Sequence, residues 1–328
     1  LYRSVQVGAS HSCSISEGHL GYCWGMDYSQ LGDGNQIVEN KYYPSPIDTS
    51  AFQGQIISNL FVGYYDNCIT TESGKSYCWG YNSNGETGTG LSVGPIYKPT
   101  EINSTYINGS LISFALGGSH SCALNSSGQL YCWGSNSLCQ LGPVGGQNSK
   151  IPNPVSMSAL NGQTFISITA GSRHTCGLTN LGNAYCWGEG LYGQLGIVSR
   201  PYMSCNFAAV DISALGGEKF VQLEAGSLFT CGITNKGKAY CWGSNGGNLG
   251  TGDYNEHNIP APVNMSPLNG ENFTKLSAAY YHACGIVNSG KVYCWGSDGA
   301  GQLGNGPTLA QTSSSPTIIF MPGPIKIC

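Results

Sequence analysis

The sequence has little charge: 13 Lys and Arg and 17 Asp and Glu stand among 328 residues, for a net charge of −4. The basic surface that a phosphate backbone attracts is missing, which argues against a nucleic-acid partner. No apolar run reaches the roughly 18 residues that a membrane span needs, and no segment has the apolar periodicity of an amphipathic helix. Since Gly, Pro and Tyr are abundant (49, 15 and 20 residues), an all-β chain with many turns is expected.

The short motifs of common active sites are also missing. The sequence contains no Gly-x-Ser-x-Gly elbow, no phosphate-binding loop and no His-Glu-x-x-His, and its carboxylates recur in no paired spacing. We therefore expect no enzyme, no catalytic residue, no metal site and no cofactor.

Cysteine, in contrast, is abundant. Fifteen cysteines without the Cys-x-x-Cys spacing of metal sites indicate an oxidising compartment and a secreted, extracellular protein. A chain beginning at Leu1 fits a processed product. Acceptor tripeptides for N-glycans give weaker support, and we expect glycans at least on Asn103, in a variable connection, and on Asn125, beside a hairpin tip. The acceptors are Asn103, Asn108, Asn125, Asn264 and Asn272.

Twelve of the cysteines belong to a sixfold repeat. Each copy reads like HSCALNSSGQLYCWG from His120, with two cysteines ten residues apart, and successive copies are 53 to 55 residues apart. A Gln-Leu-Gly or related triplet and a Pro-rich stretch follow each Tyr-Cys-Trp-Gly. Proline-marked connections and short β-type runs in a unit of this length are typical of a four-stranded propeller blade.

The two cysteines of a repeat flank a short loop. In five repeats the last loop residue is Gly, which a type I turn followed by a left-handed residue requires. This loop places the cysteines opposite each other, close enough for a disulfide. The first repeat has His19 where Gly is expected, so its turn is expected to differ. The predicted pairs are Cys13–Cys23, Cys68–Cys78, Cys122–Cys132, Cys176–Cys186, Cys231–Cys241 and Cys284–Cys294.

These repeats resemble the regulator of chromosome condensation repeat family, whose unit has a Gly-x-x-His approach, a hairpin ending in Tyr-x-Trp-Gly and an Asn-x-x-Gly-Gln-Leu-Gly turn. The resemblance covers nearly the whole chain and implies a β-propeller, usually seven-bladed. A cysteine pair in every blade resembles the extracellular branch, such as crinkly-type receptor ectodomains. The nucleotide-exchange activity of the nuclear member is not expected to carry over.

The repeat count predicts six blades, with the family's seven as the alternative. Residues 316–328 correspond to the start of a repeat, and the chain begins partway through one. We therefore predict one domain over 1–328, a ring closed by the complementary segments 1–13 and 316–328. The alternative is that residues 317–320 complete a blade of a neighbouring molecule, because an unpaired strand edge accepts any matching strand.

His11, His120, His174 and His282 stand two residues before a cysteine, on the same strand face. A metal or nucleophile site is conceivable there, but a residue that recurs with the blade is expected to satisfy a backbone carbonyl, and disulfide sulfur is neither ligand nor nucleophile. The six repeated Trp residues are likewise assigned to packing between blades rather than to a carbohydrate platform. Cys139 and Cys205 lie in neighbouring loops and could pair, which leaves Cys328 for an intermolecular bond.

Three functions are compatible with this sequence. The leading hypothesis is a non-enzymatic extracellular structural or adhesion protein that self-assembles into a polymer or matrix. The alternative is a secreted recognition module, a receptor ectodomain or inhibitor, that binds another extracellular protein through variable connections such as 88–108 and 197–209. A carbohydrate-active enzyme with a site on the propeller axis is the third.

Overall fold

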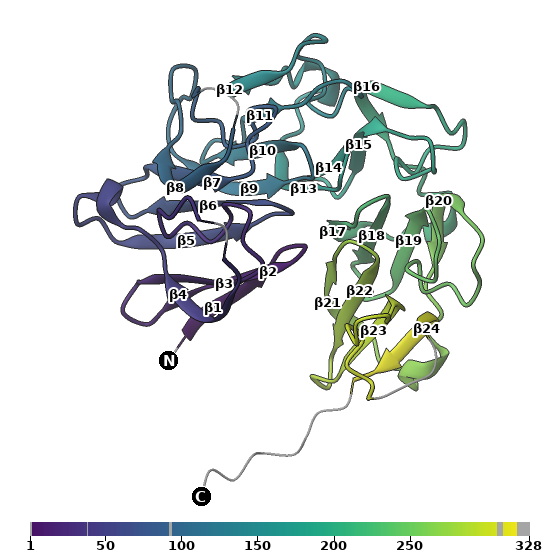
Figure 1. Cartoon of the computed structure of the whole chain (residues 1–328). Coiled ribbons are helices and arrows are strands. Elements are labelled where there is room, and N and C mark those ends of the chain that lie inside the picture. Colours follow the sequence, from purple (N-terminus) through teal and green to yellow (C-terminus); the bar gives the residue numbers. More distant parts are fainter. Residues whose placement is uncertain (1, 38, 92–93, 307–310, 320–328) are drawn as a thin grey trace, which may run out of the picture. The chain divides into compact units, whose positions relative to one another are not determined.

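The computed structural model describes residues 2–37, 39–91, 94–306 and 311–319 (Figure 1). The chain divides into two compact units. Unit 1 comprises Leu1–Gly190 and Tyr202–Ala208, and unit 2 comprises Leu191–Pro201 and Ala209–Cys328.

Unit 1 contains four sheets, each made of four consecutive antiparallel strands. We call the sheets blades and number them in chain order. Blade 1 is β1 (Tyr2–Val7), β2 (His11–Ser16), β3 (Gly21–Gly25) and β4 (Lys41–Pro46); blade 2 is β5 (Ile57–Val62), β6 (Asp66–Thr71), β7 (Ser76–Gly80) and β8 (Ile96–Glu101). Blade 3 is β9 (Leu111–Leu116), β10 (His120–Asn125), β11 (Leu130–Gly134) and β12 (Ser149–Pro154); blade 4 is β13 (Phe165–Ala170), β14 (His174–Thr179), β15 (Ala184–Glu189) and β16 (Met203–Ala209). Short 3-10 helices η1 (Ser50–Phe52) and η2 (Ser158–Leu160) lead into blades 2 and 4.

Unit 2 repeats the same architecture twice. Blade 5 is β17 (Phe220–Ala225), β18 (Phe229–Thr234), β19 (Ala239–Gly243) and β20 (His257–Pro262), and blade 6 is β21 (Phe273–Ala278), β22 (His282–Val287), β23 (Val292–Ser297) and β24 (Thr312–Ile318). The 3-10 helices η3 (Ser213–Leu215) and η4 (Ser266–Leu268) precede these blades. The fold is an all-β, six-bladed β-propeller, as the repeat count predicted, and the seven-bladed alternative is not needed. In the described residues no helix has the length and apolarity to cross a membrane.

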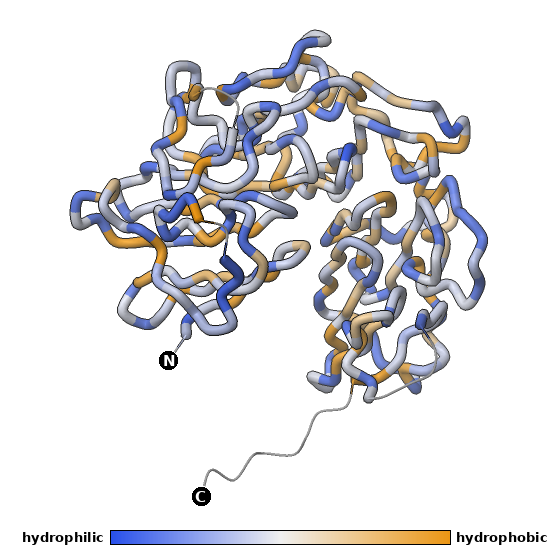
Figure 2. Tube along the Cα trace, in the orientation of Figure 1, coloured by the Kyte–Doolittle hydropathy of each residue, from blue (hydrophilic) through white to orange (hydrophobic). Residues whose placement is uncertain are grey.

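The hydrophobic core lies between successive blades rather than inside one sheet. One cluster joins Cys122 and Leu130 of blade 3 to Phe165 and Trp187 of blade 4. In unit 2, Phe229 and Cys241 of blade 5 pack with Phe273 of blade 6 in the same way. Apolar and polar residues are interspersed along the strands (Figure 2), since a strand sends alternate side chains to opposite faces.

Each predicted cysteine pair is joined by a disulfide across the central hairpin of its blade. The paired residues are directly opposite in register, for example Cys122 and Cys132, with Cα atoms 4.1 Å apart. The first turn does not differ as the sequence suggested. His19 takes the left-handed conformation (φ 60°) that Gly74 takes in blade 2 (φ 82°), with the same backbone hydrogen bond three residues back.

The two chain ends lie in different sheets. β1 pairs with β2 in blade 1, and β24 pairs with β23 in blade 6, where Thr317 is opposite Cys294. The described part of the C-terminal segment, residues 316–319, therefore belongs to its own repeat rather than to the blade that contains β1. Residues 320–328, including Cys328, lie outside the described residues, so closure by the two ends stays a prediction.

We expect the six hairpin disulfides in native material, because each pair lies opposite across a tight turn. Peptide mapping under non-reducing conditions checks this. Free thiols at these positions, or peptides that join different blades through them, would contradict the hairpin assignment.

Candidate functional site

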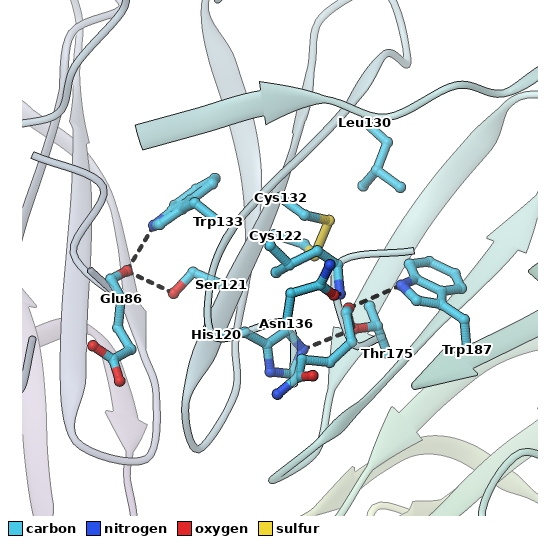
Figure 3. Close-up of a disulfide and its surroundings, with 12 residues drawn as sticks. Glu86, His120, Ser121, Cys122, Leu130, Cys132, Trp133, Asn136, Thr175 and Trp187 are labelled. Atoms are coloured by element: carbon cyan, nitrogen blue, oxygen red, sulfur yellow. Dashed lines mark hydrogen bonds between the residues drawn. A yellow bond between two sulfur atoms is a disulfide. The ribbon is translucent and has the colours of Figure 1, made fainter. Parts of the chain in front are cut away.

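Within each unit, neighbouring repeats are connected by a hydrogen-bonding arrangement centred on one main-chain oxygen. In five repeats the residue before Leu-Gly or Thr-Gly offers its carbonyl oxygen to the indole N–H of the Trp in the next repeat (Figure 3). The bonds run from Trp79 to Gln30 (3.0 Å), Trp133 to Glu86 (2.6 Å), Trp187 to Gln140 (3.0 Å), Trp242 to Gln194 (3.0 Å) and Trp295 to Asn248 (3.0 Å).

Four of these oxygens accept a second bond from the residue that precedes the first cysteine of the next blade. In Figure 3, Ser121 and Trp133 both point at the carbonyl oxygen of Glu86, and the Ser121 hydroxyl lies 2.9 Å from it. The other second donors are Asn67 to Gln30 (2.8 Å), Thr175 to Gln140 (2.9 Å) and Thr230 to Gln194 (2.9 Å). We call the carbonyl with its donors the inter-blade latch. The predicted packing role of the repeated Trp residues is therefore directly visible.

The local sequence holds the latch carbonyl in position. The Gln140 side chain accepts the backbone N–H of Leu138, and the Asn136 side chain accepts that of Leu141, so the turn is fixed from both sides. Such short-range bonds from Asn and Gln side chains are typical of tight turns. Gly88 follows in the same turn of blade 2, where a Cβ would contact the Trp133 indole and where φ is 68°. A larger residue there would separate the two blades.

The repeated His adds a third member to the latch. His120 Nε2 lies 2.7 Å from the Thr175 hydroxyl, and His11 Nε2 lies 2.8 Å from Asn67 Oδ1. The His nitrogen is the donor in both cases, because the Thr175 hydroxyl donates to Gln140 and the amide oxygen of Asn67 can only accept. For His11 and His120 the sequence-based expectation of a backbone carbonyl as partner was wrong. Their partner is a side chain of the next blade.

Two junctions replace this His. In blade 2 Asp66 takes the position, and its Oδ2 lies 3.2 Å from the Ser121 hydroxyl. A protonated Asp66 would donate to Ser121 as His120 donates to Thr175. In blade 5 Phe229 takes the position, and the residue opposite, before Cys284, is Ala283; both are buried in one apolar cluster. The change on one side of a junction is matched on the other.

Burial controls the charge of these groups. It lowers the pKa of His11 to about 4 and that of His120 to about 3, because a buried imidazolium loses its hydration. Burial also raises the pKa of Asp66 well above its usual value, with a smaller contribution from the nearby Glu86 carboxylate. Burial therefore favours the neutral form of all three groups in the folded protein.

The cysteines beside these histidines are all tied in disulfides, so they offer neither thiolate nucleophile nor metal ligand. Among the residues that the structure describes, no three His, Cys, Asp or Glu side chains come together as a metal site would require. Outside the repeat, Cys139 and Cys205 form a seventh disulfide, with Cα atoms 4.7 Å apart.

The acceptor asparagines differ in exposure. Asn125 is 1% exposed; its Nδ2 donates to the Asn108 carbonyl, and its Oδ1 accepts the N–H groups of Ser127 and Gln129. A glycan on this nitrogen is incompatible with the fold, so the expectation for Asn125 is withdrawn. Asn108 and Asn272 are exposed and Asn103 and Asn264 half-buried, and their glycosylation remains a prediction.

One end of the strands in unit 1 has a row of variable side chains. There the β1–β2, β5–β6, β9–β10 and β13–β14 connections meet the residues that follow Tyr-Cys-Trp-Gly, as in the bonds from Met26 N to Ser10 O and from Tyr81 N to Tyr65 O. We call this row the loop face: Ser10, Met26, Tyr64, Tyr65, Tyr81, Ser119, Ser135, Arg173 and Glu189. It is apolar and aromatic at blades 1 and 2, small and polar at blade 3, and charged at blade 4.

The repeat matches the family described as "Regulator of chromosome condensation (RCC1) repeat" over residues 127–178, 182–233, 236–286 and 289–327. The chain belongs to the RCC1 repeat family. The Ultraviolet-B receptor UVR8 of Arabidopsis thaliana is 31% identical over 94% of this chain and 68% of its own length. The RCC1 repeat thus accounts for both the latch and the hairpin.

Solved structures share the RCC1 fold. Human WBSCR16 superposes with a TM-score of 0.87 at 20% identity, over 98% of this chain and 83% of that one. The CRINKLY ectodomain of the Arabidopsis thaliana receptor kinase ACR4 gives a TM-score of 0.53 at 21% identity, over 90% of this chain and 79% of that one. At these identities the likeness concerns the fold alone.

The buried RCC1-repeat histidines predict a loss of stability in acid. Their folded pKa values lie below the unfolded value of about 6.5, so the unfolded chain binds more protons and stability falls as pH drops from about 6.5 toward 4. Replacing His120 by Phe, the residue that blade 5 itself carries, should reduce the pH dependence of the unfolding free energy. Measured by urea unfolding, the slope should fall by up to about 1.4 kcal/mol per pH unit in that window. An unchanged slope would contradict the neutral, buried assignment.

The matched variant Asp66→Asn should act in the opposite direction. Since the folded pKa of Asp66 is raised, its contribution to the unfolding free energy is complete below about pH 4 and is lost as the pH rises. Asn keeps a donor for Ser121 without a titration, so this variant should be more stable than the parent at pH 7 and no more stable at pH 3. Equal effects at both pH values would show that Asp66 does not titrate on unfolding.

Proposed function

We propose that this chain is a non-catalytic protein-recognition module of an extracellular, oxidising compartment, with the loop face of unit 1 as its contact surface. A cysteine pair in all six blades supports the compartment, because disulfides persist where thiols are not kept reduced. The loop face supports the binding role, because its side chains differ in chemistry from one repeat to the next.

The aromatic part of the loop face carries the proposal. Tyr64, Tyr65 and Tyr81 form a chain of edge-to-face contacts, with ring centroids 6.4 and 6.2 Å apart. Tyr65 and Tyr81 nevertheless remain 37% and 42% exposed, and Met26 of blade 1 is 38% exposed. Tyr, Met and Arg are enriched at protein interfaces, where rigid aromatic side chains fill pockets at low entropic cost. Arg173, which is exposed at blade 4, would lie at the polar rim.

The variable connections 88–108 and 197–209 named from the sequence have a different place. They contain the whole of β8 and of β16, so they form outer strands of blades as well as loops. We therefore assign recognition to the loop face first.

The double variant Tyr65→Ser, Tyr81→Ser should lose partner binding by roughly tenfold or more, since truncation of a hot-spot residue costs about 2 kcal/mol. The partner is first identified by chemical cross-linking of native material and mass spectrometry, and affinities are then measured with purified proteins. Tyr106→Ser is the matched control, since Tyr106 is exposed in the connection between blades 2 and 3. Equal losses in both variants, or none in the double variant, would reject the loop face.

A self-assembling structural role is the second candidate, and blade 1 supports it. Val5 and Val7 are 57% and 63% exposed, whereas the corresponding Leu60 and Leu116 of blades 2 and 3 are buried. Trp24 is half-buried, unlike the Trp residues of the later blades. This surface carries the Trp donor of a latch, and it would accept the latch carbonyl of a second copy of the chain.

Light scattering distinguishes the two. If copies assemble through blade 1, the parent protein should exceed the mass of one chain at micromolar concentration, and Val7→Asp should reduce it to a monomer. Ile112→Asp, at another exposed inner-strand position, is the control and should not. A parent protein that is already monomeric would remove the assembly role and assign the surface to closure within one chain.

A further inference from the structure

A cavity of about 270 Å³ opens in unit 1 between the β6–β7 hairpin and the connection from β8 to β9. Its walls include the apolar side chains of Ile102, Ile107 and Leu111, and its rim includes Lys75 and Glu101. The cavity lies away from the loop face, at the hairpin end of the blades, and plays no part in the latch.

The cavity exists because this connection departs from the repeat. In register with Leu111, the inner strands of blades 4, 5 and 6 carry Phe165, Phe220 and Phe273, all fully buried. Two residues after the buried Ile or Val that follows the outer strand, this connection has Ser104 where the connections into blades 4, 5 and 6 carry Met157, Ile212 and Met265. Smaller residues at both positions leave the space that Phe and Met or Ile occupy in blades 4 to 6.

The backbone departs as well. The connections into blades 2, 4, 5 and 6 each contain a 3-10 helix that buries Phe52, Leu160, Leu215 or Leu268, but residues 102–110 contain none. The segment from Ile102 to Leu111 is also one residue shorter than the segment from Val155 to Phe165. Ile107, which takes the place of the buried Leu or Phe, is only half-buried and lines the cavity.

The rim carries two opposite charges, one from the hairpin and one from the end of the outer strand. In blades 5 and 6 the matching Lys238 and Lys291 pair instead with Glu218 and Glu271 of the preceding connection. Lys75 Nζ lies 3.0 Å from Glu101 Oε2, and both side chains are about half exposed. In register with Glu101, blades 1, 3 and 5 carry Pro46, Pro154 and Pro262 at the end of the outer strand. The acid and the cavity therefore occur together at one blade.

We propose that this cavity binds a free α-amino acid with an apolar side chain. The ammonium group would pair with Glu101, the carboxylate with Lys75, and the side chain would enter between Ile102, Ile107 and Leu111. A small recess that combines apolar side chains with a few converging polar groups is a usual form of a ligand site. The existing ion pair is no obstacle, because exposed pairs contribute little and each partner keeps free hydrogen-bonding capacity.

A ligand series tests the chemistry by calorimetry on the full-length protein. L-Leucine should bind at least tenfold more tightly than leucinamide, which lacks the carboxylate, than 4-methylpentanoate, which lacks the amine, and than glycine, which lacks the side chain. N-acetyl-leucinamide represents a peptide side chain. Equal binding of this neutral compound would overturn the proposal in favour of a peptide partner, and no binding of leucine at millimolar concentration would overturn it entirely.

Variants locate the site. Leu111→Phe and, separately, Ser104→Met restore the residues that fill this space in other blades, so each should abolish leucine binding while the melting temperature stays the same or rises. Lys75→Met and Glu101→Gln should each weaken binding at least tenfold. Lys238→Met, at the matching hairpin position of blade 5, is the control and should bind as the parent does. Undiminished binding by both filled variants would overturn the site, and because they follow the chain's own repeat, at least one is expected to fold.

Discussion

A single main-chain oxygen per blade, held at a tight turn, is the constraint on which the rest of this fold depends. At Glu86 and Gln140 it accepts an indole N–H and a hydroxyl from the next blade. An individual bond of this kind contributes about 1 kcal/mol, but a buried donor left without its acceptor costs about 1–3 kcal/mol. One contact thus requires the Trp at its position, the turn that carries Gln or Glu, and the Gly two residues later in that turn. These are not separate motifs.

Because each latch and each hairpin disulfide uses the same few positions of the repeat, the remaining positions are free to differ. The loop face and the cavity both consist of such positions: neither Tyr65 and Tyr81 nor Ser104 and Leu111 take part in a latch. A scaffold with so little charge and so many cross-links tolerates these changes, since the interior between blades is retained. The side chains that distinguish one blade from another therefore lie at the two ends of the strands, in the loop face and in the cavity.

Sequence reasoning predicted what repeats locally and that the Trp residues pack between blades, but it missed the polar partners that cross from blade to blade. Cysteines ten residues apart around a Gly turn must lie opposite each other, so their pairing followed from local geometry. The partner of His120 could not be predicted, because Thr175 is 55 residues away and no spacing rule places it opposite. Asn125 looked exposed beside a hairpin tip, yet its side chain folds back to cap its own turn. The cavity arises from Ser104, Ile107 and Leu111 together, and none of them is unusual alone.

Residues of the repeat are replaced in matched pairs across the junction between two blades rather than within one blade. Where Asp66 replaces His, its partner on the next blade is Ser121, whose hydroxyl can accept a hydrogen bond from a protonated Asp66. Where Phe229 replaces His, the partner is Ala283, and an apolar contact replaces the polar one. The Trp295 bond to Asn248 persists at that apolar junction, so the His contact is an accessory to the latch. A residue at one edge of a blade is therefore constrained by the facing edge of the next blade more than by its own repeat, and substitutions that respect the repeat consensus but ignore the junction would leave a buried donor unpaired.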